Sequence, residues 1–442
     1  MRRPVLWVAA LALLQGACAS STSGPVTTLR FWAMGREGEV VAELIADFER
    51  ENPGIRVHAQ QIPWSAAHEK FLTAFVGNAT PDLAQLGNTW MAEFAALGAL
   101  EPVDRRLEGS AVSREAYFPG TWDGNVVDGV TYGLPWYVDT RVLFYRRDLF
   151  ARAGYSTMPQ RWDEFRAALA AVRRQSGGKT FPLMLPLNEY EPLVVMGLQA
   201  GSPLLADDAT RGAFSQAEFR RAFDFYLGLY RDQLAPPVRN NEIANLYQEF
   251  ARGYFAAMIT GPWNLGEFQR RLPPELQGAW TTAPLPGPDG PASGFSLAGG
   301  SSLVMFRRSR HPDAAWKLME FLSRPEQQLR FYHLTGDLPA RREAWADTAL
   351  SADPRIRAFG EQLQRVKPSP KLPEWELIAN RLRDQSERAV RGAAPPDTVL
   401  ADLDREVDRL LEKRRWLMEK KKKAAAVGAA NERTPIAMGP PR

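Results

Sequence analysis

Residues 28–60, TLRFWAMGREGEVVAELIADFERENPGIRVHAQ, decide the fold. The first six alternate between polar and apolar side chains, as a strand does. The apolar residues that follow recur at the spacing of one helix face: Val40, Val41, Leu44, Ile45 and Phe48. Asn52-Pro53-Gly54 ends this helix before a second alternating run, residues 55–60. A strand, a helix and a strand in this order predict a parallel sheet covered by helices.

The same alternation of elements continues along the chain. Residues 81–86, 254–259 and 303–306 are short apolar runs typical of buried strands. Amphipathic or helix-starting patterns predict helices at 90–97, 162–173, 215–231, 246–252, 311–322 and 325–334. The chain has 442 residues, of which 45% are apolar, so it can bury a large core but exceeds the usual size of one domain. We therefore expect an α/β protein with two lobes.

Several classes of site are disfavoured by the composition. Gly35 and Gly38, after the first strand, are too sparse for a dinucleotide-binding loop, and no phosphate-binding loop follows any strand. The single cysteine, Cys18, allows no internal disulfide, and four scattered histidines argue against a structural zinc site. We expect no metal and no cofactor.

The N-terminus has the pattern of an export signal. Arg2 and Arg3 precede an apolar run from Val5 to Leu14, which is about ten residues where a membrane-spanning helix needs about twenty. Residues 1–17 are therefore predicted to be a signal peptide that is removed. The small residues before Cys18 resemble the bacterial lipoprotein signal, which implies a lipid on Cys18. Ordinary secretion with an unmodified Cys18 is the alternative. Residues 18–26 are small and polar and predict a flexible tether.

The basic character of the chain is concentrated at its ends. Residues 413–423, KRRWLMEKKKK, hold seven basic residues and one acid. Without this segment and without Arg2 and Arg3, the formal net charge of +4 becomes −4. We interpret residues 413–442 as a basic, disordered tail that begins as a solvated helix end, with weak contact to anionic lipid as the alternative. A nucleic-acid partner is not expected.

A second stretch, GLPWYVDTRVLFYRRD at 133–148, points to a binding cleft. Strand propensity accounts for Val142 to Tyr145, but it does not require the preceding Trp136, Tyr137 and Asp139. Flat apolar rings beside an acid suit a site that holds a ligand. The competing interpretation makes the two aromatic residues part of the core and the acid a turn former.

Seven sequence words in a fixed order resemble one protein family: FERENPGIRV (48–57), TPDLAQL (80–86), GVTYGLPWYVDTRVLFYRRDLFARAGY (129–155), MPQRWDEF (158–165), GYFAAMITGPW (253–263), APLPGP (283–288) and AWKLMEFLSRPEQQ (315–328). Through these segments the chain resembles the extracellular solute-binding proteins of ATP-driven (ABC) importers. The resemblance covers about residues 27–410 and is strongest to the branch that includes maltose- and trehalose-binding proteins.

The resemblance implies a two-lobed periplasmic-binding-protein fold, with a mostly parallel sheet in each lobe and the ligand between the lobes. Lobe 1 would contain residues 27–138 and about 298–345, and lobe 2 residues 139–297 and about 346–412. The protein would catalyse nothing. It would work as a monomer on the outer face of the cytoplasmic membrane, bind a sugar such as trehalose or maltose by hinge closure, and hand it to the transmembrane subunits of a permease.

The resemblance and the local chemistry together give a set of candidate ligand contacts. A sugar needs aromatic plates for its C–H faces and carboxylate, amide or guanidinium groups for its hydroxyls. The candidates are Trp136, Tyr137, Asp139, Trp263, Asn264, Arg341, Gly300, Ser301, Tyr190, Glu191, Asn88, Trp64 and Glu37.

Three of these candidates have specific competing roles. Trp64 could pack on the surface, Glu37 shares its loop with Glu39 as a helix cap, and Arg341 could form a surface salt bridge. The trehalose-type pattern also has an acid near Gly87, which this sequence lacks.

Two other functions remain open at this point. A binding protein that serves a signalling receptor would have the same cleft without import. A secreted glycoside hydrolase would also combine aromatic rings with two carboxylates, and Glu189 and Glu191 could play that part.

Overall fold

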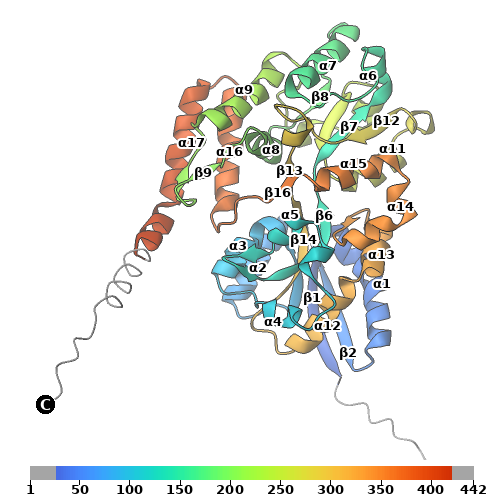
Figure 1. Ribbon diagram of the computed structural model, residues 1–442, viewed down its shortest axis with the longest axis vertical. Coiled ribbons are helices and arrows are strands. Elements are labelled where there is room, and N and C mark those ends of the chain that lie inside the picture. Colours follow the sequence, from blue (N-terminus) through green and yellow to red (C-terminus); the bar gives the residue numbers. More distant parts are fainter. Residues whose placement is uncertain (1–25, 421–442) are drawn as a thin grey trace, which may run out of the picture.

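The computed structural model describes residues 26–420, which form two lobes with a sheet in each (Figure 1). The first lobe holds a six-stranded sheet in the order β15-β6-β14-β3-β1-β2. Its strands are β1 Thr27–Met34, β2 Ile55–Ile62, β3 Leu83–Gly87, β6 Gly133–Asp139, β14 Gly299–Met305 and β15 Leu338–Pro339. The β-α-β unit read from residues 28–60 is present, because β1 pairs parallel to β2 along its whole length.

The second lobe holds a four-stranded sheet in the order β12-β7-β11-β8. Its strands are β7 Val142–Arg146, β8 Leu183–Met184, β11 Ala257–Thr260 and β12 Trp280–Ala283. Three strand pairs lie outside these sheets: β4 Val126–Val127 with β5 Val130–Thr131, β9 Leu205–Ala206 with β10 Arg211–Gly212, and β13 Ser296–Leu297 with β16 Val366–Lys367.

Helices cover both sheets. Those of the first half of the chain are α1 Gly35–Glu51, α2 Trp64–Val76, α3 Met91–Ala96, α4 Asp104–Leu107, α5 Pro119–Asp123, α6 Arg147–Arg152, α7 Trp162–Gln175, α8 Glu191–Gln199 and α9 Ala217–Arg231. The remainder are α10 Leu246–Ala251, α11 Trp263–Arg271, α12 Pro312–Leu322, α13 Pro325–Thr335, α14 Thr348–Ser351, α15 Pro354–Leu363, α16 Trp375–Val390 and α17 Pro396–Leu410. Short 3-10 turns are η1 Asn88–Trp90, η2 Arg114–Ala116, η3 Asn240–Glu242, η4 Pro274–Leu276, η5 Pro291–Ser293 and η6 Arg342–Ala346.

The two-lobed α/β fold is confirmed, but the sheets are mixed, not mostly parallel. Strand β14 runs antiparallel to both β3 and β6, and β7 runs antiparallel to β11 and β12. The reason is the connectivity, because β6 leaves the first lobe and β14 returns to it from the second. A strand that returns by a crossing segment is not constrained to run parallel as it is in a β-α-β unit.

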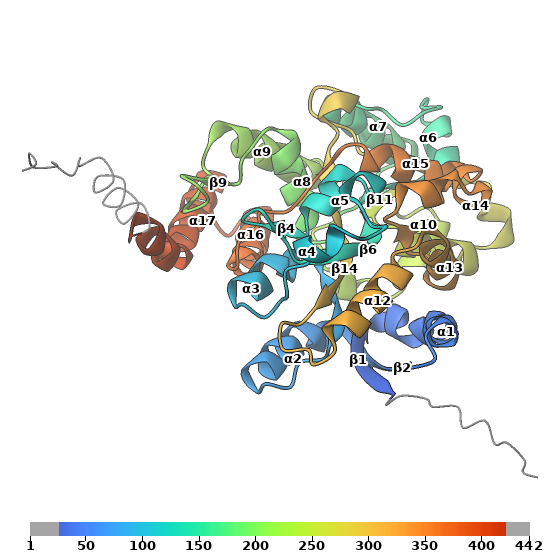
Figure 2. The ribbon, with the colours of Figure 1, turned by 60° about the horizontal axis from the view of Figure 1, so that its bottom comes forward.

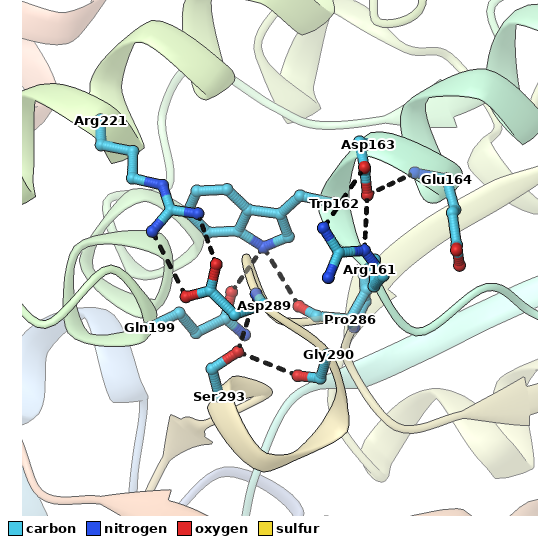
Figure 3. Close-up of polar contacts among 10 residues, drawn as sticks. All are labelled: Arg161, Trp162, Asp163, Glu164, Gln199, Arg221, Pro286, Asp289, Gly290 and Ser293. Atoms are coloured by element: carbon cyan, nitrogen blue, oxygen red, sulfur yellow. Dashed lines mark hydrogen bonds and ion pairs between the residues drawn. The ribbon is translucent and has the colours of Figure 1, made fainter.

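The segment that leads back to the first lobe is fixed by a polar cluster in the second (Figure 3). The Trp162 indole N–H lies 2.9 Å from Gln199 Oε1 and 3.2 Å from the Pro286 carbonyl oxygen. Gln199 Nε2 also donates to the carbonyl oxygen of Phe295. The turn-rich residues 283–294 are therefore tied to α7 and α8, and they hold β13 at the start of the crossing.

The tail prediction needs correction over residues 413–420. After α17 the chain continues as a helix over residues 412–420 instead of becoming disordered at 413. Arg414 Nε and an Arg415 guanidinium N–H donate to the carbonyl oxygens of Ala209 and Thr210, which attach this turn to the second lobe. The signal peptide, Cys18 and residues 421–442 lie outside the described residues.

Trp136 belongs to the core and does not face the cleft. Its ring is 0% exposed and stacks on Phe331 of α13 with 4.3 Å between ring centroids. The physical reason is the period of the strand: along β6, Tyr137 and Asp139 share one face and Trp136 points to the other. The interpretation as a core residue was therefore the right one for Trp136.

We expect Trp136→Ala to lower the free energy of unfolding by about 3–5 kcal/mol, because it leaves a cavity against Phe331. Trp136→Phe should lower it much less, since the indole N–H has no hydrogen-bond partner among the described residues. Urea unfolding would measure both. A Trp136→Phe variant that stays fully stable but loses ligand binding would contradict the placement of this ring in the core.

Candidate functional site

A cleft of about 460 Å³ lies between the two sheets, and its walls come from both lobes. The first lobe contributes the residues that follow the carboxyl ends of its strands: Arg36 and Glu37 after β1, Trp64 after β2, and Asn88, Thr89 and Trp90 after β3. The second contributes Tyr190 and Glu191 at the start of α8 and Trp263 at the start of α11. Open α/β sheets bind ligands at this end of their strands.

Three tryptophan rings line the cleft. Trp64 and Trp90 meet edge to face in the first lobe, with 5.9 Å between ring centroids. Trp263 comes from the second lobe, and its ring remains 41% exposed. Trp64 is 39% exposed. Large apolar rings left this accessible inside a cleft are available to cover an apolar ligand face.

The position of the Trp263 ring requires a residue without a side chain at Gly261. A Cβ atom at residue 261 would lie 1.9 Å from the indole ring, so the ring folds back over the glycine. Gly300, another wall residue, has a φ of +115° and leaves no room for a Cβ atom, which would lie 2.3 Å from the Tyr137 carbonyl oxygen. A side chain at either position would clash, at residue 261 with the Trp263 ring and at residue 300 with the backbone of β6.

A hydrogen-bond network fixes Glu37 and Tyr137 on the first-lobe wall. The Tyr137 hydroxyl donates to Glu37 Oε1 at 2.7 Å, and the Ser301 hydroxyl donates to Tyr137 at 3.0 Å. Gln85 Nε2 also lies within 3.3 Å of the oxygens of these three side chains. Burial, followed by the nearby Glu37, raises the pKa of Tyr137 well above its ordinary value, so the phenol stays protonated. Ser301 acts from behind Tyr137 and is not itself a wall residue.

Asp139 and Arg141 carry buried polar atoms without partners. Asp139 Oδ1 and Arg141 Nε are buried and have no hydrogen bond within the described part of the chain. Arg141 does pair with Glu191, with 2.9 Å between a guanidinium nitrogen and Oε1, and it lies 5.5 Å over the Trp263 ring. Burial raises the pKa of Asp139 to about 6, although Arg141 opposes the shift. A buried acceptor and donor that lack partners are available to a ligand.

Asp337 is a further carboxyl group of the wall, in addition to Glu37, Asp139 and Glu191. Asp337 follows α13 and lines the cleft beside Thr335. Burial raises its pKa well above the ordinary value, and the charges of Glu37 and Asp139 add to the effect. The charges of Glu37 and Asp139 thus act on Asp337, and all three carboxyl groups line the cleft.

Nine of the thirteen predicted contacts line the cleft: Tyr137, Asp139, Trp263, Gly300, Tyr190, Glu191, Asn88, Trp64 and Glu37. Trp136, Asn264, Arg341 and Ser301 do not. Asn264 is buried behind Trp263, where its amide donates to Thr260 and accepts from Tyr247. Arg341 is buried in the first lobe, where it donates to the Ser323 carbonyl oxygen and lies over the Tyr117 ring.

Several wall residues are not among the thirteen predicted contacts, including Arg36, Trp90, Arg141, Thr335, Asp337 and Ser369. Arg141 had a signal, since it stands two residues after Asp139 in the 133–148 stretch. Trp90 also had one, because it follows Asn88 at the end of β3. Asp337 and Ser369 had none, because they reach the cleft from segments distant in sequence.

Other kinds of site are not evident in the described residues. Within residues 26–420, no group of three or more His, Cys, Asp or Glu side chains is arranged to hold a metal ion. Over the same range, no helix combines the length and the apolar character that crossing a bilayer needs.

Known proteins resemble the chain over nearly its whole described length. The sugar-binding protein MalE of Xanthomonas citri, a solved structure, is 50% identical with a TM-score of 0.86, over 89% of this chain and 99% of that one. An ABC transporter solute-binding protein of Thermotoga lettingae, solved with α-D-tagatose, is 25% identical with a TM-score of 0.74, over 87% of this chain and 100% of that one. The maltotriose-binding protein of Pyrococcus abyssi is 24% identical over 347 residues, 77% of this chain and 72% of that protein.

These relatives are binding proteins, not enzymes. The sequence model of the family of bacterial extracellular solute-binding proteins matches residues 34–329 of this chain. These residues include most of the cleft wall. The chain therefore belongs to the bacterial extracellular solute-binding protein family.

Proposed function

We propose that this protein is the sugar-binding component of an ABC importer and that it delivers a di- or oligosaccharide to a membrane permease. The observation that carries the proposal is the wall of the cleft. Trp64 and Trp90 line it from one lobe and Trp263 from the other, and carboxyl groups and Arg141 line the same cleft. A sugar ring has apolar C–H faces and a rim of hydroxyls, and this wall is complementary to both.

The size of the cleft supports a small carbohydrate. About 460 Å³ lies within the range of roughly 300–1,000 Å³ that small-molecule sites occupy. The relatives named above bind sugars of different sizes, and maltose and trehalose are our first candidates for this chain. This chain lacks the acid that the trehalose-type pattern has near Gly87. The contact that this acid makes in that pattern is therefore not proposed for this chain.

Hinge closure explains how the protein would retain its ligand. The chain crosses between the sheets directly after β6 and directly before β14, and Asp139, Arg141 and Gly300 lie at these crossings. A rotation of the lobes about the crossings would bring Trp263 toward Trp64 and Trp90 while the hinge residues move least. The ligand would then be enclosed by rings from both lobes.

The protein would act outside the cytoplasm, at the membrane. The export signal and Cys18 support a lipid-anchored protein on the outer face of the cytoplasmic membrane, acting as a monomer beside the permease. Mass spectrometry of the exported protein would reveal diacylglycerol on Cys18, and an unmodified N-terminus after residue 17 would leave simple secretion.

The ligand class is tested by thermal unfolding of residues 19–442 with a panel of sugars. The panel should include trehalose, maltose, longer maltodextrins, β-linked glucans and amino sugars, with amino acids and peptides as controls. A ligand that binds only the folded state raises the melting temperature. A shift with one sugar class supports the proposal, whereas a shift with peptides alone overturns it. Product release from any glycan would point to a hydrolase instead.

Import is separated from signalling in cells. Deletion of the gene should abolish uptake of the radiolabelled sugar, and the wild-type copy should restore it. Normal uptake combined with a lost transcriptional response would favour a sensor that serves a signalling receptor.

We expect Trp64→Ala and Trp263→Ala each to weaken sugar binding by about 1–3 kcal/mol, because each removes a stacking surface. Isothermal titration calorimetry would measure the change. Trp416→Ala is the matched control, since this ring is also exposed but lies outside the cleft. Equal affinities for all three variants would remove the aromatic rings from the binding site.

Asp139→Asn should stabilise the free protein and weaken its sugar binding. The folded protein keeps the proton of Asp139 up to a pH of about 6, whereas the unfolded chain releases it near pH 4. The stability of the parent therefore falls as the pH rises through this window, and the variant should be more stable at pH 7 by about 1–3 kcal/mol. Sugar affinity of the parent should rise over the same window, because the carboxylate accepts hydroxyl hydrogen bonds.

Urea unfolding and calorimetry at pH 4.5 and pH 7.5 would test both statements. The stability difference between parent and variant should be clearly smaller at the lower pH, because Asp139 is protonated in the folded protein there while the unfolded chain is still partly ionised. An equal difference at the two pH values would assign the effect to packing and not to the charge of Asp139.

A further inference from the structure

The helix of residues 412–420 projects from the second lobe beyond α17, at the left of both overall views (Figures 1 and 2). One side of it is attached to the protein. Arg414 Nε donates to the Ala209 carbonyl oxygen at 3.1 Å, and Arg415 donates to the carbonyl oxygens of Thr210 at 2.7 Å and Asp408 at 2.6 Å. These contacts fix which side of the helix faces away from the lobe.

The outward side combines two apolar side chains with two lysines. Lys413, Trp416, Leu417 and Lys420 follow the spacing of a single helix face and are all exposed. Trp416 is 53% exposed and Leu417 is 43% exposed. Lys420 Nζ lies 3.9 Å from the centroid of the Trp416 ring. We call these four residues the outer face of the helix. Glu412 and Glu419 are also exposed but lie on a flank of the helix, away from the centre of this face.

We propose that the outer face of the 412–420 helix rests on the surface of an anionic lipid bilayer. Tryptophan is favoured at the level of the lipid headgroups, because its ring is apolar and its N–H is polar. Lysines on either side can extend to the phosphates while their stems cover apolar surface. The sequence adds Lys421, Lys422 and Lys423 directly after the helix, which extends the positive charge.

Charge and size favour a bilayer over a protein partner. Residues 413–423 carry a net charge of +6, while the chain without both basic ends carries −4, so a negative surface would attract this end alone. Two exposed apolar side chains are far fewer than a stable protein interface needs. They are enough for a shallow contact that acts together with a second membrane attachment.

The consequence concerns orientation and rests on the proposed extracytoplasmic location. A lipid on Cys18 would tether the first lobe, where β1 starts, and the 412–420 helix would hold the second lobe near the same membrane. Two separated attachments restrict the rotation of a tethered protein and would keep a given side of it toward the permease.

The test is cosedimentation of residues 19–442, which lack any acyl chain, with vesicles. One set contains phosphatidylcholine alone, and the other contains equal amounts of phosphatidylcholine and phosphatidylglycerol. We expect binding to the anionic vesicles only, with a marked loss at high salt, because salt screens the lysines. Binding to neither set, or equally to both, overturns the proposal.

Two double variants separate the contributions of the outer face. Lys413→Gln with Lys420→Gln and Trp416→Ser with Leu417→Ser should each reduce binding to the anionic vesicles at least severalfold. Leu97→Ser with Lys179→Gln changes an exposed leucine and an exposed lysine elsewhere and should bind like the parent. If the Trp416/Leu417 variant also binds like the parent, the tail acts as a nonspecific polycation and the proposal is overturned.

Sugar-dependent thermal shifts of all variants provide the internal check. They should match the parent, because the outer face lies outside the cleft. Loss of vesicle binding with an unchanged shift isolates the membrane contact. A missing sugar shift in the parent would count against the proposed function and leave the vesicle result standing.

Discussion

The antiparallel pairing of β6 with β14 is the constraint on which the rest of the structure depends. The two strands pair from Gly133 with Val304 to Asp139 with Gly299, and each joins the other lobe within a few residues of that last pair. Their hydrogen bonds therefore determine where the chain passes between the lobes. Because side chains alternate along a strand, the same pairing places Tyr137 and Asp139 in the cleft and Trp136 in the core.

The cleft that results is stable but not fully satisfied. Gln85 and Ser301 lie behind the wall and hydrogen bond to Glu37 and Tyr137, so they hold these two wall residues in place. Asp139 Oδ1 and Arg141 Nε are also buried, and neither has a hydrogen-bond partner within residues 26–420, which costs free energy. A ligand that supplies the missing donors and acceptors recovers this cost. The site thus contains two kinds of polar group: those that hydrogen bond to one another and hold the cleft in shape, and those that remain available to a ligand.

The charge of the molecule is unevenly distributed. The cores are apolar, and the chain without its two basic ends carries a formal net charge of −4. The basic charge is gathered in residues 413–423, where the structure adds an exposed tryptophan and leucine. The sequence alone could not separate a solvated helix end from a surface-binding one, because Arg414 and Arg415 look identical to Lys413 and Lys420 in a count of charges. Only the contacts to Ala209 and Thr210 divide them into an inner and an outer face.

The sequence by itself determined the α/β class, the two-lobed family and nine of the residues that line the cleft, because strand ends and short turn motifs such as GPW at 261–263 are local patterns. The tertiary structure decided which neighbours share a face. Trp136, Asn264 and Arg341 have the right chemistry for a ligand, but each is enclosed by partners from distant segments. Asp337 and Ser369 had no local pattern that marked them as contacts, but the packing of remote segments brings them to the cleft. Local propensity specifies what a residue can bind, whereas contacts between remote segments decide whether it faces the core or the ligand.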